Sequence, residues 1–162
     1  LNGLPLFTFE LKNEGTNQNY TNGIYQYCYD RNPENRMLKH CLVHFVMDNN
    51  YVFMTTKLEG ADTKFLPFNQ DSVNPPIEGE YPVAYMWQSI LQADSILDLI
   101  ENFIKRYNDE DGKPVVIFPR FHQLRAVRKL RVKVREDGAG RNYLVWHSAG
   151  SGKTKTMAWL AH

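Results

Sequence analysis

The chain of 162 residues has a formal net charge of +1 and 43% hydrophobic residues, a composition typical of a single globular domain. The nearly neutral charge favours no particular partner, and no apolar run is long enough to span a bilayer, so we expect no membrane contact. Cys28 and Cys41 are too few and too scattered for a metal site or a disulfide framework, and they indicate reduced thiols in a cytoplasmic protein.

Residues 6–12 alternate between apolar and polar side chains, which predicts a strand whose polar face carries Glu10 and Lys12. Two residues apart on a strand, these side chains project together, about 6–7 Å apart. A carboxylate can hold Mg²⁺ while an ammonium polarises the attacking water or the scissile phosphate. This is the second half of an Asp…Glu-x-Lys nuclease arrangement, whose Asp is not among the nine upstream residues. Taken alone, this Glu-x-Lys pattern is more typical of an exposed ion pair than of a nuclease site.

Residues 13–23 are rich in Asn, Gly and Thr and predict a loop, and the aromatic-rich residues 23–29 indicate a short helix. This helix contains Gln26. In some nucleases of the Glu-x-Lys class, a downstream glutamine and tyrosine orient the metal-bound site. For the tyrosines beside Gln26, packing within a helix is the simpler interpretation.

Two β-prone runs, residues 42–47 and 51–56, flank an Asp-Asn-Asn segment and predict a hairpin, because Asn tolerates the positive φ of a tight turn. Residues 65–80 are rich in proline, predict irregular structure and mark the expected domain boundary. Residues 85–107 carry apolar side chains at three- and four-residue spacing and predict a helix, with a capping box that starts at Ser95.

A second helix is predicted over residues 123–133, within a basic stretch from Arg120 to Arg135 that contains no acidic residue. DNA phosphates would suit this stretch, but its apolar side makes a solvated helix face the simpler interpretation. Gln123 lies about 30 residues before Lys153, where a glutamine amide could donate to and accept from an adenine ring. A helix-starting loop without a ligand is the alternative.

Residues 147–154 read His-Ser-Ala-Gly-Ser-Gly-Lys-Thr and predict a phosphate-binding loop, although the first position is His147 where Gly is usual. The strand-like residues 143–146 precede it and the helix-compatible residues 156–161 follow it, as such a loop requires. The glycines would let backbone N–H groups converge on one phosphate, beside the positive end of the helix dipole.

ATP is therefore the expected ligand of this loop. Lys153 would reach the outer phosphates, and the Thr154 hydroxyl would bind Mg²⁺. A P-loop kinase or GTPase is an alternative, against which the Gln123 element and the Glu10 strand argue. The residues expected to bind the nucleotide are Gln123, Ser148, Ala149, Gly150, Ser151, Gly152, Lys153 and Thr154.

Taken in order, these motifs resemble one family, the R subunit of type I restriction enzymes. The resemblance covers nearly the whole chain, and several of its stretches are more specific than a phosphate loop. The matching stretches are residues 4–13, 26–31, 41–45, 65–69, 117–124, 147–154 and 158–162.

This resemblance implies an α/β fold, in which the back half of a restriction-endonuclease-like (PD-(D/E)xK) domain joins the start of a RecA-like P-loop motor lobe. It implies ATP-dependent DNA translocation coupled to Mg²⁺-dependent cleavage of double-stranded DNA, with modification (methyltransferase) and specificity subunits as partners. Glu10 would bind Mg²⁺, Lys12 would be its catalytic partner and Gln26 the nuclease glutamine. The Gln-x-x-x-Tyr spacing of some members is absent, because Asp30 takes the Tyr position.

By this resemblance, residues 1–75 would form the C-terminal part of the endonuclease domain and residues 76–114 a connector with an amphipathic helix. Residues 115–162 would begin the first RecA-like helicase or translocase lobe. The first residue is not Met, and the upstream nuclease Asp and the further motor strands are missing. We therefore expect an internal fragment that by itself neither cuts DNA nor turns over ATP. The alternative is a non-catalytic fragment, or another P-loop ATPase without nuclease activity.

Overall fold

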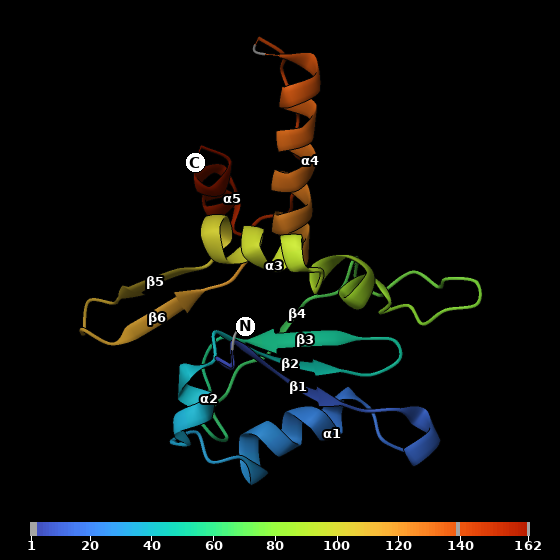
Figure 1. Cartoon of the computed structure of the whole chain (residues 1–162), viewed down its shortest axis with the longest axis vertical. Helices are drawn as coiled ribbons and strands as arrows, with labels where there is room; N and C mark the ends of the chain where they lie inside the picture. Colours follow the sequence, from blue (N-terminus) through green and yellow to red (C-terminus); the bar gives the residue numbers. More distant parts are fainter. Residues whose placement is uncertain (1–2, 139, 162) are drawn as a thin grey trace.

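The computed structural model describes residues 3–138 and 140–161 and has a mixed α/β fold (Figure 1). Its larger sheet has four strands in the order β1-β2-β3-β4. β1 pairs in parallel with β2, and the other neighbours are antiparallel. The strands are β1 (Phe7–Leu11), β2 (Val43–Met47), β3 (Val52–Thr55) and β4 (Leu66–Pro67). The strand predicted over residues 6–12 and the hairpin predicted after residue 42 are confirmed.

The segment that joins β1 to β2 is helical and lies on one side of the sheet, below it in Figure 1. It consists of η1 (Glu14–Thr16), α1 (Tyr20–Tyr25), η2 (Gln26–Asp30) and α2 (Arg36–His40). α1 continues without a break into the π-helical η2, which confirms the helix predicted over residues 23–29. The loop predicted over residues 13–23 is wrong from Tyr20 onward, because the side chain of Asn19 caps the first turn of α1.

α1 approaches the sheet closely at Gly23, which is buried. A β-carbon at this position would lie 2.6 Å from Cγ1 of Val46, 3.5 Å from Cβ of Glu10 and 3.6 Å from Cγ of Lys12. Glycine weakens a helix by about 0.5–1 kcal/mol relative to alanine, but here it permits a contact that alanine would block. α1 therefore lies directly against the polar face of β1.

The chain after residue 85 differs from the single helix predicted over residues 85–107. It forms η3 (Met86–Ile90), α3 (Ala93–Asp98) and η4 (Leu99–Phe103), and then a hairpin of β5 (Lys105–Asn108) and β6 (Pro114–Ile117). The backbone is extended at Gln92 and again at Ile104. The prediction is wrong after Phe103 because β5 pairs with β6 in a hairpin, and helical spacing of apolar residues does not report strand pairing.

The capping box predicted at Ser95 is also wrong. The N-cap of α3 is Gln92, and Ser95 lies inside the helix, where its Oγ accepts from a guanidinium N–H of Arg128 at 3.0 Å. Asp98 on the same helix forms ion pairs with Arg128 at 2.8 Å and Arg131 at 3.0 Å. Two residues of the basic stretch are thus engaged within the protein, and they join α3 to the helix that carries them.

That helix, α4 (Phe121–Asp137), confirms the second predicted helix and is longer at both ends. Its first half buries Leu124 and Val127, while its second half projects away from the rest of the molecule (Figure 1). α5 (Lys153–Ala161) contacts α4 and is fixed by Trp159, whose indole N–H donates to the carbonyl of Phe103 at 2.9 Å. Within residues 3–138 and 140–161, no helix is both long and apolar enough to cross a membrane.

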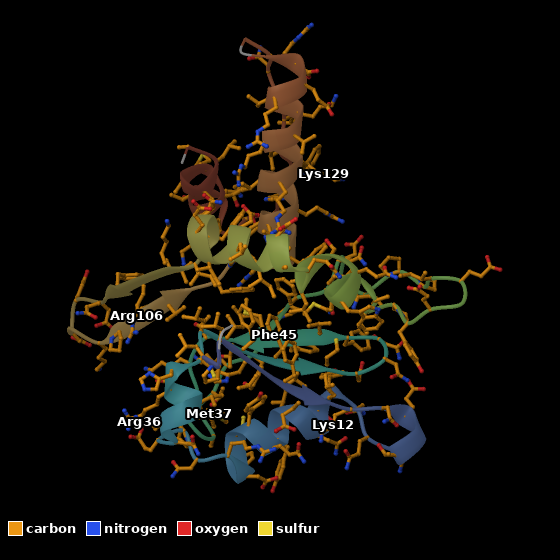
Figure 2. The ribbon with its side chains drawn as sticks, in the orientation of Figure 1. Lys12, Arg36, Met37, Phe45, Arg106 and Lys129 are labelled. Carbon is orange, nitrogen blue, oxygen red and sulfur yellow. The ribbon has the colours of Figure 1, made fainter. Side chains whose placement is uncertain are left out.

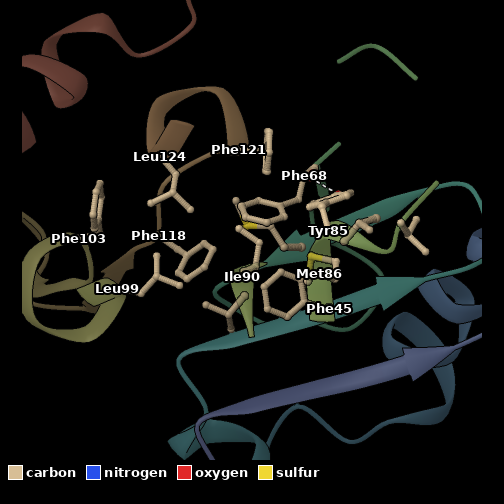
Figure 3. Packing of buried hydrophobic residues seen from close by; sticks show 14 of the residues in the cluster. Phe45, Phe68, Tyr85, Met86, Ile90, Leu99, Phe103, Phe118, Phe121 and Leu124 are labelled. Atoms are coloured by element: carbon tan, nitrogen blue, oxygen red, sulfur yellow. Dashed lines mark hydrogen bonds between the residues drawn. The ribbon is translucent and has the colours of Figure 1, made fainter. Parts of the chain in front are cut away.

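One hydrophobic cluster extends from the sheet into the helices above it (Figure 3). The ring of Phe68 is fully buried, and its centroid lies 5.7 Å from those of Phe45, Phe118 and Phe121. Further members come from η3, η4 and α5. The cluster draws on all three predicted segments, whose boundaries near residues 75 and 114 stay a prediction.

The close approach of α1 to the sheet generates the first prediction. Replacing Gly23 with alanine should lower the free energy of unfolding by about 1–3 kcal/mol, because the new methyl group overlaps a buried Val46 methyl. Urea unfolding followed by circular dichroism measures this change. Gly15→Ala is the matched control: its β-carbon would meet only the exposed Asn13 side chain, so we expect a change below about 0.5 kcal/mol. A Gly23→Ala protein as stable as the parent would contradict the contact.

Candidate functional site

β1 and η2 bring the three residues predicted for a nuclease onto one face of the sheet. The ammonium of Lys12 donates to Oε1 of Gln26 at 2.7 Å. Glu10 projects from the same side of β1, and both strand residues face Gly23 of α1. The side chain of Glu10 is largely buried, with 13% exposed. Figure 2 shows Lys12 beside α1. The three residues are therefore neighbours in space, although Gln26 lies 14 residues after Lys12.

The carboxylate of Glu10 is engaged by Arg31, which directly follows η2. Nε of Arg31 donates to Oε1 of Glu10 at 2.9 Å, and a terminal guanidinium N–H donates to the same oxygen. The hydrogen bond and the charge of Glu10 raise the pKa of Arg31 above its ordinary value. Arg31 was not predicted as a site residue from the sequence. No local pattern points to it, because the contact depends on how η2 lies on β1.

A buried polar network lies next to this site. Oγ1 of Thr8 is 2.7 Å from the hydroxyl of Tyr27 and 2.7 Å from Nδ1 of His44. Burial raises the pKa of Tyr27 to about 12, and burial lowers the pKa of His44 to about 4. Both groups are therefore neutral near pH 7, and they fix the position of η2 on the sheet without adding charge beneath Glu10.

The donor atoms at this site suit Mg²⁺. The Glu10 carboxylate and the Gln26 amide oxygen are the kinds of ligand that Mg²⁺ takes, usually together with waters and a second carboxylate. In the part of the chain that the structure describes, no three His, Cys, Asp or Glu side chains gather as a metal site. The described residues thus supply only part of a metal-binding set.

The predicted phosphate loop lies between α4 and α5. Gly150 and Gly152 have φ angles of 73° and 81°, the left-handed conformation that glycine adopts readily. The helix predicted over residues 156–161 is confirmed and begins earlier, at Lys153. The Lys153 ammonium donates to the carbonyl oxygen of Ser148 at 2.8 Å and to that of His147 at 3.4 Å. The lysine is thus folded back over its own loop.

The strand expected over residues 143–146 is not formed. The segment has no regular structure, and Leu144 and Trp146 are 88% and 89% exposed. A strand needs backbone hydrogen bonds from a neighbour, and in the described ranges 3–138 and 140–161 no strand pairs with this segment. The strand predicted here from apolar, β-prone composition is therefore wrong, because such composition alone does not form a strand.

A cavity of about 370 Å³ opens beside the loop. Ser151 has a buried Oγ that has no hydrogen-bond partner among the described residues. Ser148 and Ala149, also predicted to bind the nucleotide, are exposed in the loop. The cavity is lined by Leu66, Phe118, Arg120, Gln123, Gly150, Ser151, Gly152, Thr154 and Lys155. Most of the predicted nucleotide-binding residues thus share one concave surface.

Gln123 is buried between the start of α4 and the loop, with 4% of its surface exposed. Its Nε2 donates to the carbonyl oxygen of Gly152 at 2.9 Å, and its Oε1 accepts from the N–H of Arg120 at 2.9 Å. Beside it, Nε2 of His122 lies 3.0 Å from the carbonyl oxygen of Ser151. Both ends of the Gln123 amide are engaged by backbone, so an adenine contact would require this amide to change partners.

His147, at the unusual first position of the loop motif, packs edge-on against the ring of His122, with ring centroids 5.0 Å apart. Burial lowers the pKa of His147, and the nearby charges of His122 and Lys153 lower it further. A neutral imidazole at this position avoids adding a positive charge beside the lysine. Its aromatic contact also holds the start of the loop against α4.

No family model matches the chain. The chain is 28% identical, over 175 aligned positions, to a protein of Methanocaldococcus jannaschii named "Putative type I restriction enzyme MjaVIIIP endonuclease subunit". The alignment covers 99% of this chain and 16% of that protein, so the chain spans a small part of its relative's length. This similarity relates the chain to restriction enzymes and supports a restriction-related role.

Burial of His44 generates the second prediction. In the unfolded chain, the His44 imidazole takes up a proton near pH 6.5, whereas in the folded protein the same imidazole does so only near pH 4. The free energy of unfolding should therefore fall as the pH drops from about 6.5 to about 4, by up to about 3 kcal/mol from this residue. Urea unfolding at a series of pH values measures the slope.

His44→Asn should flatten that slope, because asparagine does not titrate and can still contact Thr8. The matched control is His40→Asn, at an exposed position at the end of α2, which should leave the slope as in the parent. An unchanged slope in His44→Asn would show that other groups cause the acid sensitivity.

Proposed function

We propose that the chain is part of a type I restriction endonuclease subunit that cleaves double-stranded DNA with Mg²⁺ and translocates DNA with ATP. The observation that carries the proposal is the contact of Lys12 with Gln26 at 2.7 Å beside Glu10. Three residues selected from the sequence for nuclease chemistry thus form one patch. The similarity to a relative named as an endonuclease subunit extends along 99% of the chain and supports the same conclusion.

In the proposed nuclease site, Glu10 and Gln26 provide oxygen atoms for Mg²⁺. The metal would activate the attacking water and stabilise charge on the leaving oxygen. Lys12 is held by the Gln26 amide, so its ammonium is oriented before DNA binds, and it would contact the scissile phosphate. Among the described residues no further acidic side chain gathers with Glu10 as a metal site, so a second carboxylate would come from another part of the full-length subunit.

In the proposed ATP site, the phosphates would lie at the N-terminus of α5, against the loop of Gly150 and Gly152. Support comes from the left-handed glycines, the adjoining cavity and the position of Lys153 at the first turn of the helix. Lys153 would leave the loop carbonyls for the outer phosphates, and the hydroxyl of Thr154 would bind the accompanying Mg²⁺. Gln123 lies at the same cavity, where its amide could exchange a backbone partner for adenine.

The proposed domains and partners come from the resemblance of the motifs to the R subunit of type I restriction enzymes. Residues 1–75 would belong to a restriction-endonuclease-like domain, and residues 115–162 would begin a RecA-like lobe. The proposed partners are double-stranded DNA and the modification and specificity subunits of a cytoplasmic complex. Because the chain spans 16% of its relative's length, tests of this function use the full-length subunit assembled with these partners.

The third prediction concerns the nuclease patch. Glu10→Gln should lower DNA cleavage by more than about a hundredfold, because it removes a negatively charged metal ligand, while DNA-dependent ATP hydrolysis is retained. Both rates are measured on the assembled complex. Glu14→Gln is the matched control, since Glu14 is exposed in η1 and contacts Asn50 rather than this patch. If Glu10→Gln still cuts at the parental rate, residues 7–11 are an ordinary strand and this part of the proposal fails.

The fourth prediction concerns the phosphate loop. Lys153→Ala should weaken ATP binding by about a hundredfold, equivalent to about 2.7 kcal/mol for a lost charge-assisted contact, and should abolish both translocation and cleavage. Binding is measured with a fluorescent ATP analogue. Lys129→Ala removes an equal charge from an exposed position on α4 and should bind nucleotide normally. Parental ATP affinity in Lys153→Ala would refute the assignment of this loop. A strong preference for guanine nucleotides would refute the motor.

A further inference from the structure

The pairing of Arg31 with Glu10 places a positive charge at the proposed metal ligand. Two N–H groups of one guanidinium converge on the same carboxylate oxygen, one of them at 2.9 Å. The ammonium of Lys12, from the same strand face, is directed instead to the Gln26 amide. The cation that contacts Glu10 is therefore the guanidinium of Arg31.

Burial makes the two partners of this ion pair unequal. The side chain of Glu10 is 13% exposed, whereas that of Arg31 is 49% exposed. A largely buried carboxylate is costly to leave without a positive partner. A half-exposed arginine loses little free energy when it leaves the ion pair, because water hydrates the freed guanidinium. Glu10 is thus the partner that depends more on the ion pair, and Arg31 is the cation that can be replaced.

We propose that Arg31 is an exchangeable counter-cation: the divalent metal displaces it from Glu10, and the released guanidinium then binds a phosphate of the DNA. This inference rests on the proposed nuclease function and adds a DNA-binding residue to it. Arg31 suits the second role because its planar fork of N–H donors matches the oxygens of a phosphate. Its half-exposed position at the end of η2 places it at the rim of the patch.

The exchange makes metal and DNA binding mutually dependent. Metal binding frees Arg31 for a phosphate, and a phosphate that holds Arg31 keeps it away from Glu10. Each ligand therefore raises the affinity of the other, by the same factor in both directions. Without DNA, Arg31 competes with the metal, which restrains metal binding until substrate is present.

The test measures Ca²⁺ binding to the full-length, assembled protein without ATP by isothermal titration calorimetry. Ca²⁺ takes oxygen ligands of the same kind as Mg²⁺. In the parent, a short DNA duplex should raise Ca²⁺ affinity. In Arg31→Gln, Ca²⁺ should bind about tenfold more tightly without DNA, because a nearby like charge is gone, and the duplex should no longer raise the affinity.

Two further variants make the comparison specific. Arg31→Lys keeps the charge but loses the fork, so it should retain the competition while binding the duplex more weakly than the parent. Arg36→Gln removes an exposed charge at the start of α2 and should behave as the parent does. Circular dichroism checks that each variant is folded.

The outcomes separate the exchange from the function on which it rests. If Glu10→Gln abolishes Ca²⁺ binding but Arg31→Gln leaves it unchanged or weaker, the exchange is overturned and the metal site stands. If Glu10→Gln leaves Ca²⁺ binding unchanged, the proposed nuclease site itself fails, and the exchange fails with it. Tighter Ca²⁺ binding in Arg31→Gln together with loss of the DNA effect supports the exchange.

Discussion

Phe68 is the residue through which the sheet and the later helices share one core. Its ring contacts Phe45 of β2, Phe118 just before α4 and Phe121 at the first position of α4. The Tyr85 hydroxyl donates to the carbonyl of Phe68 at 2.7 Å, which fixes the backbone there. Aromatic pairs of this kind contribute about 0.5–1.5 kcal/mol each beyond the area they bury. These contacts, together with the direct contact of Phe45 with Phe118, whose ring centroids lie 5.9 Å apart, join the sheet to the start of α4.

The two candidate sites lie on opposite sides of the four-stranded sheet. Figure 1 shows α1 below the sheet and α4 and α5 above it. The patch of Glu10, Lys12 and Gln26 lies on the lower face, where Gly23 lets α1 approach. The phosphate loop follows α4 on the upper side. Because close-packed interiors transmit strain, a displacement of β2 would be expected to affect both sites. The sheet is thus the common support of two chemically different surfaces.

Local sequence patterns predicted the elements that depend on local interactions. The alternation around Glu10 predicted β1, and the spacing of apolar residues after Gln123 predicted α4. The patterns failed where pairing with another segment decides the structure: Lys105–Asn108 continue a helical spacing but pair as a strand, and residues 143–146 are β-prone but have no pairing strand among the described residues. At the site, Glu10, Lys12 and Gln26 could be selected by residue type. Arg31 could not, because only the docking of η2 brings it to Glu10.

The two hydrogen bonds of the Gln123 amide have a thermodynamic consequence for any ligand of the adjoining cavity. The amide joins the backbone of Arg120 to that of Gly152, which lies 29 residues after Gln123 in the chain. A ligand that takes over this amide binds only the fraction of molecules in which the amide is free. Its observed affinity is its intrinsic affinity multiplied by that fraction. The loop is therefore held at rest by the same group that would recognise a ligand, so a ligand that uses this amide binds more weakly than it would to a loop with the amide already free.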